Sequence, residues 1–281
     1  MNTSTNKILE LIRDVQHSPT LGETYSQLID ILQQKENLEP IVWDSLHKLL
    51  KFIKIRETIA QKNNLPERFM RNLAHDSEWT VRKKVARNPN LSIELMEALA
   101  NDPDANVRGE IAAHPSVSEQ TMELLYKDKA SFVRRNLARN KATEERFIRI
   151  LATDEWDTVR QAVCNNKNLP NDLIPVLAKD DAFMVRASIA RHPDLPQNLM
   201  ENLANDIDYL VRAGLAANPN LPEHVMEVLA TSKNISVMET LLRNPRLPIE
   251  LMEKFADDKR DLYRWALSKN PSLTESLKQK L

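Results

Sequence analysis

The chain has 281 residues and a formal net charge of −1, and 42% of its residues are hydrophobic and 28% charged. This composition is typical of a chain with a buried core, and the near-neutral charge removes bulk electrostatics as an argument for nucleic-acid or membrane binding. Three glycines and one cysteine exclude glycine-rich phosphate loops, intramolecular disulfides and multi-cysteine metal sites. The cysteine usage, together with the lack of a signal-peptide pattern or a long apolar run, predicts a cytoplasmic protein that does not enter a membrane.

Residues 1–63 carry three helical hydrophobic patterns, over about residues 5–16, 24–34 and 39–61. The third contains Ile55-Arg56, which lies in register with the repeats that follow. We interpret residues 1–63 as a helical N-terminal cap that ends in a degenerate repeat, because stacked repeats need polar-faced ends.

A 26-residue repeat dominates the rest of the chain. The dipeptide Val-Arg recurs at this spacing six times, from Val81-Arg82 to Val211-Arg212. An aspartate stands six residues before most of these arginines, and Asn or His stands six residues after, usually followed by proline. Eight full copies therefore cover residues 64–271, and residues 272–281 are predicted to form a capping helix.

Each copy predicts two short helices. In residues 195–219, Leu199, Met200 and Leu203 share one helical face, and Pro196 suits the first turn of that helix. A polar turn follows, then a second apolar set that ends at Asn218-Pro219, because the residue before proline is pushed out of the α region. One copy is too small to bury its own apolar face, so stacking of copies into an all-α solenoid is predicted.

The string Val-Arg-x-x-Val/Ile-Ala-x-Asn-Pro-x-Leu-Pro-x-x-Leu-Met-x-x-Leu-Ala-x-Asp resembles the leucine-rich repeat variant, and the Asp-x5-Arg spacing resembles HEAT repeats. The resemblance covers about three quarters of the chain and implies a right-handed α-solenoid with some 3₁₀ character in one helix. Some members of the variant family carry a cysteine-ligated iron–sulfur segment. This chain departs from them, since Cys164 lies inside a repeat, and no cofactor is expected.

The recurring aspartates and arginines are interpreted as structural, because catalytic groups occur once per site and these occur in almost every copy. The seventh copy loses both, with Ser232 and Met238 in their places, which favours a salt bridge within each repeat. Arg56 has Leu50 at the matching position and needs another acceptor. The predicted structural ladder consists of Asp76, Arg82, Asp102, Arg108, Asp128, Arg134, Asp154, Arg160, Asp180, Arg186, Asp206, Arg212, Asp258 and Arg264.

The Asn/His column is predicted to hydrogen-bond backbone groups between neighbouring repeats. His114 and His192 belong to it and are interpreted as turn residues rather than metal ligands. Cys164 takes a polar slot of the second helix, with no partner for reactive-thiol chemistry. Without a catalytic or metal-ligand motif, the sequence predicts that the protein is not an enzyme.

Function is therefore expected on positions that do not repeat. Basic residues occupy outward slots of the second helices, where HEAT-like stacking predicts a concave face, and aromatic residues collect at the turn between the two helices of a repeat. Either set could also serve only as solvated surface or as seals between repeats. The candidate partner-binding residues are Lys83, Lys84, Arg87, Arg135, Arg139, Arg191, Arg243, Lys269, Trp79, Trp156, Phe183 and Tyr209.

The leading hypothesis is a scaffold that binds a protein through this face and edge, with an acidic or phosphorylated segment favoured by the cations. The alternative is a nucleic-acid-binding solenoid, although alanine and asparagine interrupt its basic slots. A structural spacer is a third possibility.

One turn departs from the pattern. Residues 140–144 lack both prolines, and Thr143 takes the place of a usually buried leucine. We expect this turn to have the lowest local stability of the turns between repeats.

Overall fold

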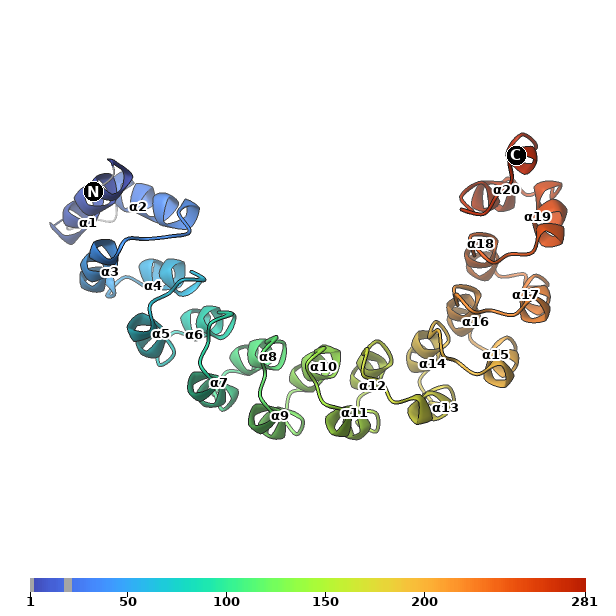
Figure 1. Ribbon diagram of the computed structural model, residues 1–281, viewed down its shortest axis with the longest axis horizontal. Coiled ribbons are helices and arrows are strands. Elements are labelled where there is room, and N and C mark those ends of the chain that lie inside the picture. The colour runs from blue at the N-terminus through green and yellow to red at the C-terminus, as the bar shows by residue number, and fades with distance from the viewer. Residues whose placement is uncertain (1–2, 18–21) are drawn as a thin grey trace. The chain divides into compact units, whose positions relative to one another are not determined.

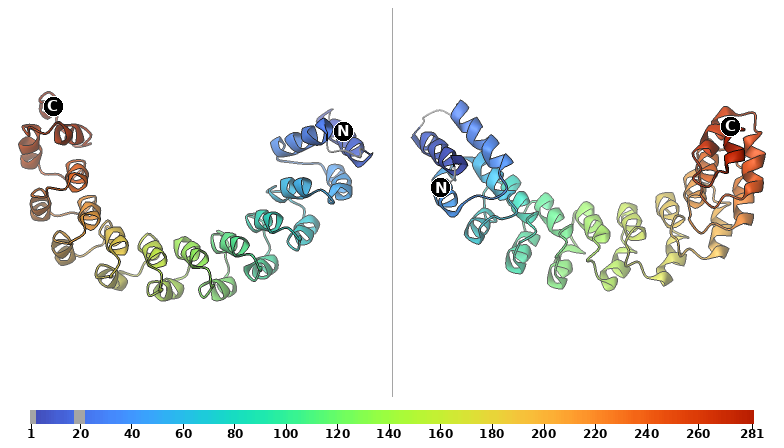
Figure 2. Two further views of the ribbon diagram at one scale, coloured as in Figure 1. Left: turned by 180° about the vertical axis from the view of Figure 1, so that it is seen from behind. Right: turned by 45° about the horizontal axis from the view of Figure 1, so that its top comes forward.

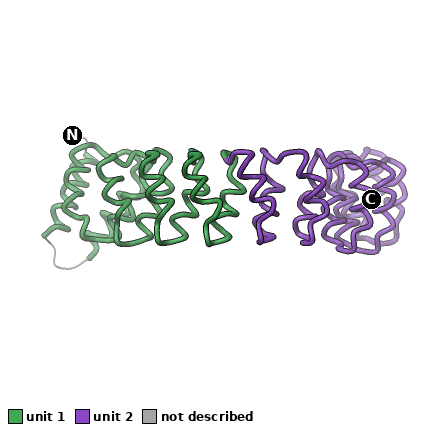
Figure 3. Tube along the Cα trace, turned by 90° about the horizontal axis from the view of Figure 1, so that it is seen from below, with its two compact units in different colours: residues 1–142 green, residues 143–281 purple. Residues whose placement is uncertain are grey.

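The computed structural model describes residues 3–17 and 22–281, and within these ranges it holds twenty-one α-helices, two 3₁₀ helices and no strand. The protein is thus an all-α solenoid of helix pairs, as the repeat predicts. The chain divides into two compact units, Met1–Ala142 and Thr143–Leu281 (Figure 3). The division falls within the turn at residues 140–144, whose softness stays a prediction.

The first unit contains the cap and the first repeats. Its helices are α1 (Thr3–His17), α2 (Glu23–Gln34), α3 (Pro40–Leu46), the 3₁₀ helix η1 (His47–Leu49), α4 (Ile53–Ala60), α5 (Glu67–Leu73), α6 (Trp79–Ala86), α7 (Ile93–Ala100), α8 (Ala105–Ala112), α9 (Glu119–Leu125) and α10 (Ser131–Arg139).

The second unit continues the same alternation. Its helices are α11 (Glu145–Leu151), α12 (Asp157–Cys164), the 3₁₀ helix η2 (Asn171–Leu173), α13 (Ile174–Leu177), α14 (Phe183–Ile189), α15 (Gln197–Leu203), α16 (Tyr209–Ala216), α17 (Glu223–Leu229), α18 (Ile235–Leu242), α19 (Ile249–Ala256), α20 (Asp261–Ser268) and α21 (Glu275–Lys278).

Within each unit the helices form two layers. The even-numbered helices from α4 onward are the second helices of the repeats and lie on the inner side of the unit's curve, and the first helices lie on its outer side (Figures 1 and 2). Small residues on the inner layer allow close packing. A Cβ added to Gly214 on α16 would overlap the carbonyl oxygen of Ala187 on α14, and one added to Gly109 would lie 2.9 Å from the Phe132 ring.

Apolar side chains from both layers form the core. In the repeat of α15 and α16, Leu199, Met200 and Leu203 are buried from the first helix, and Val211 and Leu215 from the second. These are the positions that the helical spacing assigns to the buried face. Thr143 is also fully buried, in the position that leucine or valine takes in the other repeats.

Three local features differ from the sequence patterns or refine them. The pattern over residues 39–61 forms two α-helices, α3 and α4, and α4 begins 26 residues before α6, as a degenerate repeat would require. Pro196 is the N-cap of α15 and not its first helical residue. In the fifth repeat Pro175 has no backbone N–H and cannot donate a helical hydrogen bond. The first helix of this repeat is divided into η2 and α13. The 3₁₀ character implied by the family resemblance thus occurs in the first-helix position.

The Asn/His column forms the predicted bonds between neighbouring repeats. The side chain of Asn244 donates to the carbonyl oxygen of Asn218 at 3.0 Å, and its own Oδ1 accepts the backbone N–H of Arg246 at 2.9 Å. His114 substitutes directly, since its Nε2 lies 2.9 Å from the carbonyl oxygen of Asn88 and its Nδ1 accepts the N–H of Ser116. The side chains of this column therefore stabilise the turns between neighbouring repeats, as predicted.

Candidate functional site

The arginine–aspartate ladder connects neighbouring repeats, and the predicted pairing within each repeat is wrong. Arg82 donates to the carboxylate of Asp102 in the next repeat, from Nε to Oδ2 at 2.6 Å and from Nη2 to Oδ1 at 2.8 Å. Toward its own repeat, Arg82 donates from Nη1 to the backbone carbonyl oxygens of Asp76 at 2.7 Å and Ser77 at 3.1 Å. The aspartate six residues earlier thus contributes its backbone, and the aspartate twenty residues later contributes its charge.

This geometry repeats in both units. The described side-chain pairs of the ladder are Arg56–Asp76, Arg82–Asp102, Arg108–Asp128, Arg160–Asp180 and Arg186–Asp206. The cross-repeat register also supplies the acceptor that Arg56 needed, since its Nε lies 2.5 Å from Oδ2 of Asp76.

Each ladder pair lies near the protein interior. The side chains of Arg82 and Asp102 are 11% and 4% exposed. Burial alone would raise the pKa of Asp180, but the hydrogen bonds from Arg160 and from the Ala182 N–H outweigh it and lower that pKa. Its carboxylate therefore stays charged and accepts two hydrogen bonds from the guanidinium group of Arg160.

Among the described pairs, the ladder is interrupted at the seventh repeat. Ser232 occupies the aspartate position that would face Arg212, and in the described chain Arg212 donates only from Nη1, to the carbonyl oxygens of Asp206 and Ile207. On the other side of the break Met238 replaces the arginine that would reach Asp258, and that carboxylate instead binds Arg260, from Nη2 to Oδ2 at 2.6 Å. Asp258 has acquired a local cation, whereas Arg212 has acquired no carboxylate.

The cations of the basic stripe, meaning the eight candidate lysines and arginines on the second helices, are partly neutralised in the first unit. Glu110 on α8 lies 2.7 Å from Nη2 of Arg87 and 3.4 Å from Nζ of Lys83. Burial lowers the pKa of Lys84, which is only half-exposed. Arg139 is exposed, and Arg135 is half-buried on the same helix.

The second unit carries the other three members of the stripe. Arg243 is paired with Glu239 at 2.7 Å and lies over the ring of Trp265, with 4.8 Å between its guanidinium carbon and the ring centroid. Arg191 and Lys269 are exposed just after the C-terminal ends of α14 and α20. The structure thus presents separate cations rather than a continuous row.

The turn edge, where the second helices begin, exposes apolar side chains. The four aromatic candidates there are Trp79 at 39% exposure, Trp156 at 52%, Phe183 at 39% and Tyr209 at 41%. Phe183 and Tyr209 are the first residues of α14 and α16, and Ile235, at 55% exposure, is the first residue of α18. Because α14, α16 and α18 pack side by side, these three residues form a row. Phe132 instead packs against Gly109 and seals a gap between α8 and α10.

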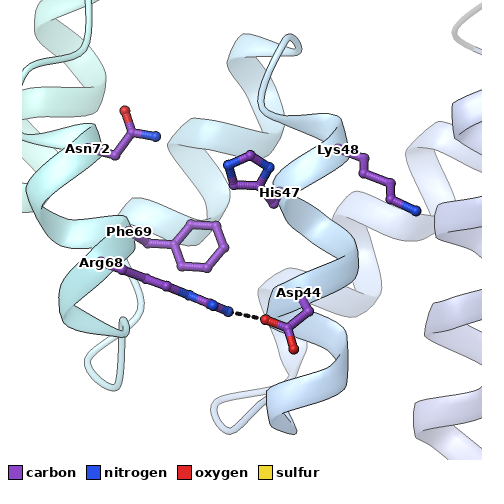
Figure 4. A pocket seen from close by; sticks show the side chains of 6 residues that line it. All are labelled: Asp44, His47, Lys48, Arg68, Phe69 and Asn72. Atoms are coloured by element: carbon purple, nitrogen blue, oxygen red, sulfur yellow. Dashed lines mark hydrogen bonds and ion pairs between the residues drawn. The ribbon is translucent and has the colours of Figure 1, made fainter.

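Two hollows contain charged side chains, one in each unit. The one in Figure 4, of about 370 Å³, lies between α3–η1 and α5, where Asp44 binds Arg68 across its opening and the Phe69 ring forms one wall, 6.4 Å from the His47 ring centroid to centroid. The other, of about 330 Å³, is lined by Arg212 and Ser232 at the break of the ladder. No sequence pattern predicts either hollow.

Side chains that could bind a metal ion or act as nucleophiles are dispersed over the described residues. Among residues 3–17 and 22–281, no three His, Cys, Asp or Glu side chains are grouped so that they could hold a metal ion. Cys164 is buried, contrary to its predicted polar slot, and burial raises the pKa of its thiol to about 12. None of the helices in the described ranges has both the length and the apolar character needed to cross a bilayer.

Comparisons with known proteins point to a repeat family. A comparison with curated proteins gives no match. Among solved structures, a crystal structure titled as an engineered protein of the Northeast Structural Genomics Consortium is 14% identical over 99% of both chains, with a TM-score of 0.35. The family model described as leucine rich repeat variant matches residues 79–104, which are one repeat from the start of α6 to the turn before α8. The resemblance to this family of helical repeats, stated from the sequence, is thereby confirmed.

Proposed function

We propose that this protein is a non-enzymatic scaffold that binds another protein through the turn edge and the inner face of its second helices. The observation that carries the proposal is the row formed by Phe183, Tyr209 and Ile235, with Trp156 exposed at the same edge of the second unit. Exposed aromatic side chains gathered on one surface are typical of protein-binding hot spots, because a large apolar area is desolvated when a partner covers it.

The exposed cations that follow the C-terminal ends of the second helices favour a partner with acidic groups. Phe183 is the first residue of α14, and Arg191 lies two residues after its last residue, Ile189, so an aromatic ring and an exposed charge lie at opposite ends of this helix. Complementary charge at the rim of an interface accelerates association and selects among partners more than it adds affinity.

The nucleic-acid alternative is less well supported. Such binding depends on many unpaired cations along the phosphate backbone. Here Glu110 neutralises Lys83 and Arg87, and Glu239 neutralises Arg243, which leaves isolated charges rather than a continuous basic groove.

Affinity capture from an extract of the source cells, with and without nuclease, tests the proposal. The variant Phe183→Ala/Tyr209→Ala removes two rings from the turn edge. The matched control Ile150→Ala/Val176→Ala removes two exposed apolar side chains from the first-helix layer of the same unit, where they are 45% and 57% exposed.

We expect the wild type and the control to retain the same proteins in the presence of nuclease, and the edge variant to lose them by at least about tenfold, the effect of losing about 1.4 kcal/mol. Capture that nuclease abolishes would favour the nucleic-acid alternative. Equal capture by the edge variant and the control would show that the turn edge is not the binding surface. Circular dichroism would verify that both variants fold.

A further inference from the structure

We propose that the break in the arginine–aspartate ladder at Arg212 is a binding site for a carboxylate, which an acidic segment of a partner protein inserts where the neighbouring repeats supply an aspartate of their own. This inference deepens the proposed function, and its biological use rests on that function. The site itself is argued from the geometry of the second unit.

The guanidinium of Arg212 has the anchoring that its paired counterparts have. In the preceding repeat, Arg186 donates from Nη1 to the carbonyl oxygens of Asp180 and Asp181, at 2.8 and 2.9 Å. Arg212 makes the same two contacts, to Asp206 and Ile207. These bonds from Nη1 fix the orientation of the planar guanidinium group. Its Nε and Nη2 can then donate to a group contributed by the next repeat.

At Arg186 those two nitrogens bind the carboxylate of Asp206, at 2.7 and 3.0 Å. At Arg212 the corresponding residue is Ser232, whose Oγ accepts the backbone N–H of Asn234 at 3.2 Å. The serine thus keeps one role of the aspartate, acceptance of the turn N–H, and loses the other, which is the bidentate bond to arginine. The carboxylate missing from the ladder has not been replaced by the chain.

The space left by the shorter side chain is open. A hollow of about 330 Å³ lies at this position, and Arg212, Ser232, Thr231 and Lys233 line it. Arg212 and Lys233 are cationic, and Asp206, the acidic residue of the lining, is already bound to Arg186. The hollow therefore carries excess positive charge, two hydroxyl groups and a preorganised bidentate donor, which together suit a carboxylate.

The hollow also adjoins the surface proposed for protein binding. Ile207, whose carbonyl oxygen holds Arg212, is 96% exposed in the turn before α16, and Tyr209 follows two residues later. An acidic residue flanked by apolar residues fits this combination, because its carboxylate reaches Arg212 while its neighbours cover Ile207 and Tyr209. A free anion would use only the first of these contacts.

Two matched peptides test the site on the full chain: acetyl-Leu-Asp-Leu-amide, and acetyl-Leu-Asn-Leu-amide, which has the same shape without the charge. Binding is followed by the NMR signals of the arginine Nε–Hε groups. We expect the aspartyl peptide to shift the Arg212 signal saturably, and the asparaginyl peptide to bind about 10- to 100-fold more weakly, the range for removal of a charged hydrogen-bonding partner.

Variants at the break supply the controls. Ser232→Asp should complete the ladder, abolish peptide binding and raise the midpoint of thermal unfolding. Ser232→Ala, which removes one lining hydroxyl group but leaves the Arg212 donor exposed to the hollow, should retain most of the binding. Arg212→Gln, in which binding is followed by the backbone amide signals of the lining residues Thr231 and Lys233, should weaken binding by about 10- to 100-fold. Equal affinity for the two peptides, or undiminished binding by Ser232→Asp, would overturn the inference. Saturation of the Arg212 signal by inorganic phosphate but not by the aspartyl peptide would also overturn it, since the ligand would then not be a carboxylate.

Failure of the site and failure of the proposed function are distinguishable. Cellular capture that depends on Phe183 and Tyr209 but not on Ser232→Asp would refute the site alone. Peptide binding that Ser232→Asp abolishes, without edge-dependent capture, would refute the proposed scaffold and leave the site.

Discussion

Truncation of two arginines in the same column measures what the ladder contributes to stability. Arg160→Ala removes a bidentate partner of Asp180, with Nε–Oδ2 and Nη2–Oδ1 distances of 2.7 and 2.8 Å. Arg212→Ala removes the same side chain from the break, where no aspartate faces it. The two variants lose similar apolar stems and similar bonds to their own turns, so the difference between them isolates the carboxylate pair.

The expected magnitudes follow from burial. Breaking a buried ion pair by removing one partner costs about 3–5 kcal/mol. The side chains of Arg160 and Asp180 are 17% and 9% exposed, so water offsets part of this cost and about 2–4 kcal/mol is expected for Arg160→Ala. Arg212→Ala loses only bonds to carbonyl oxygens, about 1–2 kcal/mol. Because both variants lose similar bonds to carbonyl oxygens, the difference between them should be about 1–2 kcal/mol.

Urea unfolding followed by circular dichroism gives the free energies, and amide exchange locates the loss. Exchange should accelerate around α12 and α14 in Arg160→Ala and around α16 and α18 in Arg212→Ala. Arg160→Lys is a useful third variant and should lie between wild type and alanine, because an ammonium cannot make the bidentate pair. Equal losses for the two alanine variants would refute the structural role of the cross-repeat pair.

Four further predictions concern single residues. Gly214→Ala should destabilise the protein by about 1–3 kcal/mol in thermal unfolding despite alanine's better helix propensity, because the added Cβ overlaps Ala187; a stabilised variant would show that α14 and α16 have room to separate. The pKa of Asp180 is lowered on folding, so the stability it contributes is complete above about pH 5 and is lost as the pH falls below the unfolded value of about 4; Asp180→Asn should flatten this acid limb of the unfolding midpoint, and an unchanged limb would contradict it. Cys164, with its thiol pKa raised to about 12, should react with iodoacetamide only after unfolding, whereas rapid labelling of the native chain would contradict its burial. Amides near Thr143 should exchange faster than those in the proline-containing turn at Pro219, and uniform protection of both turns would remove the expected soft point.

The sequence determined the architecture because its information is periodic. A spacing of 26 residues, apolar positions at helical intervals and proline or asparagine at the ends suffice to predict two helices per repeat and the stacking of repeats. The role of the Asn column could also be predicted from the sequence, because an amide side chain before a turn hydrogen-bonds to backbone groups in the same way in each copy.

Tertiary structure alone decided which members of two columns meet. In a perfect repeat, pairing an arginine with the aspartate six residues before or twenty residues after gives the same pattern, because both register choices repeat every 26 residues. The irregular copies do not settle the choice, because Arg56 lacks an aspartate at position 50, whereas the seventh copy loses both partners together; the contact of Arg56 with Asp76 in the structure decides it. The same ambiguity hid the break at Arg212, since an intra-repeat pair would leave no arginine unpaired when Ser232 and Met238 replace both partners.

The positions of the surface cations were predictable from the sequence, but their ion pairs depend on the tertiary structure. The columns predicted which slots of the second helices are basic, but ion pairing between repeats depends on the distance across the helix layer. Glu110 reaches both Lys83 and Arg87 because α6 and α8 pack closely. Likewise, helical spacing gave Cys164 a polar slot, and the approach of α14 buries it within 3.8 Å of the Val185 carbonyl oxygen. A one-dimensional pattern specifies which residues share a face, whereas the packing of the next repeat specifies what each of them touches.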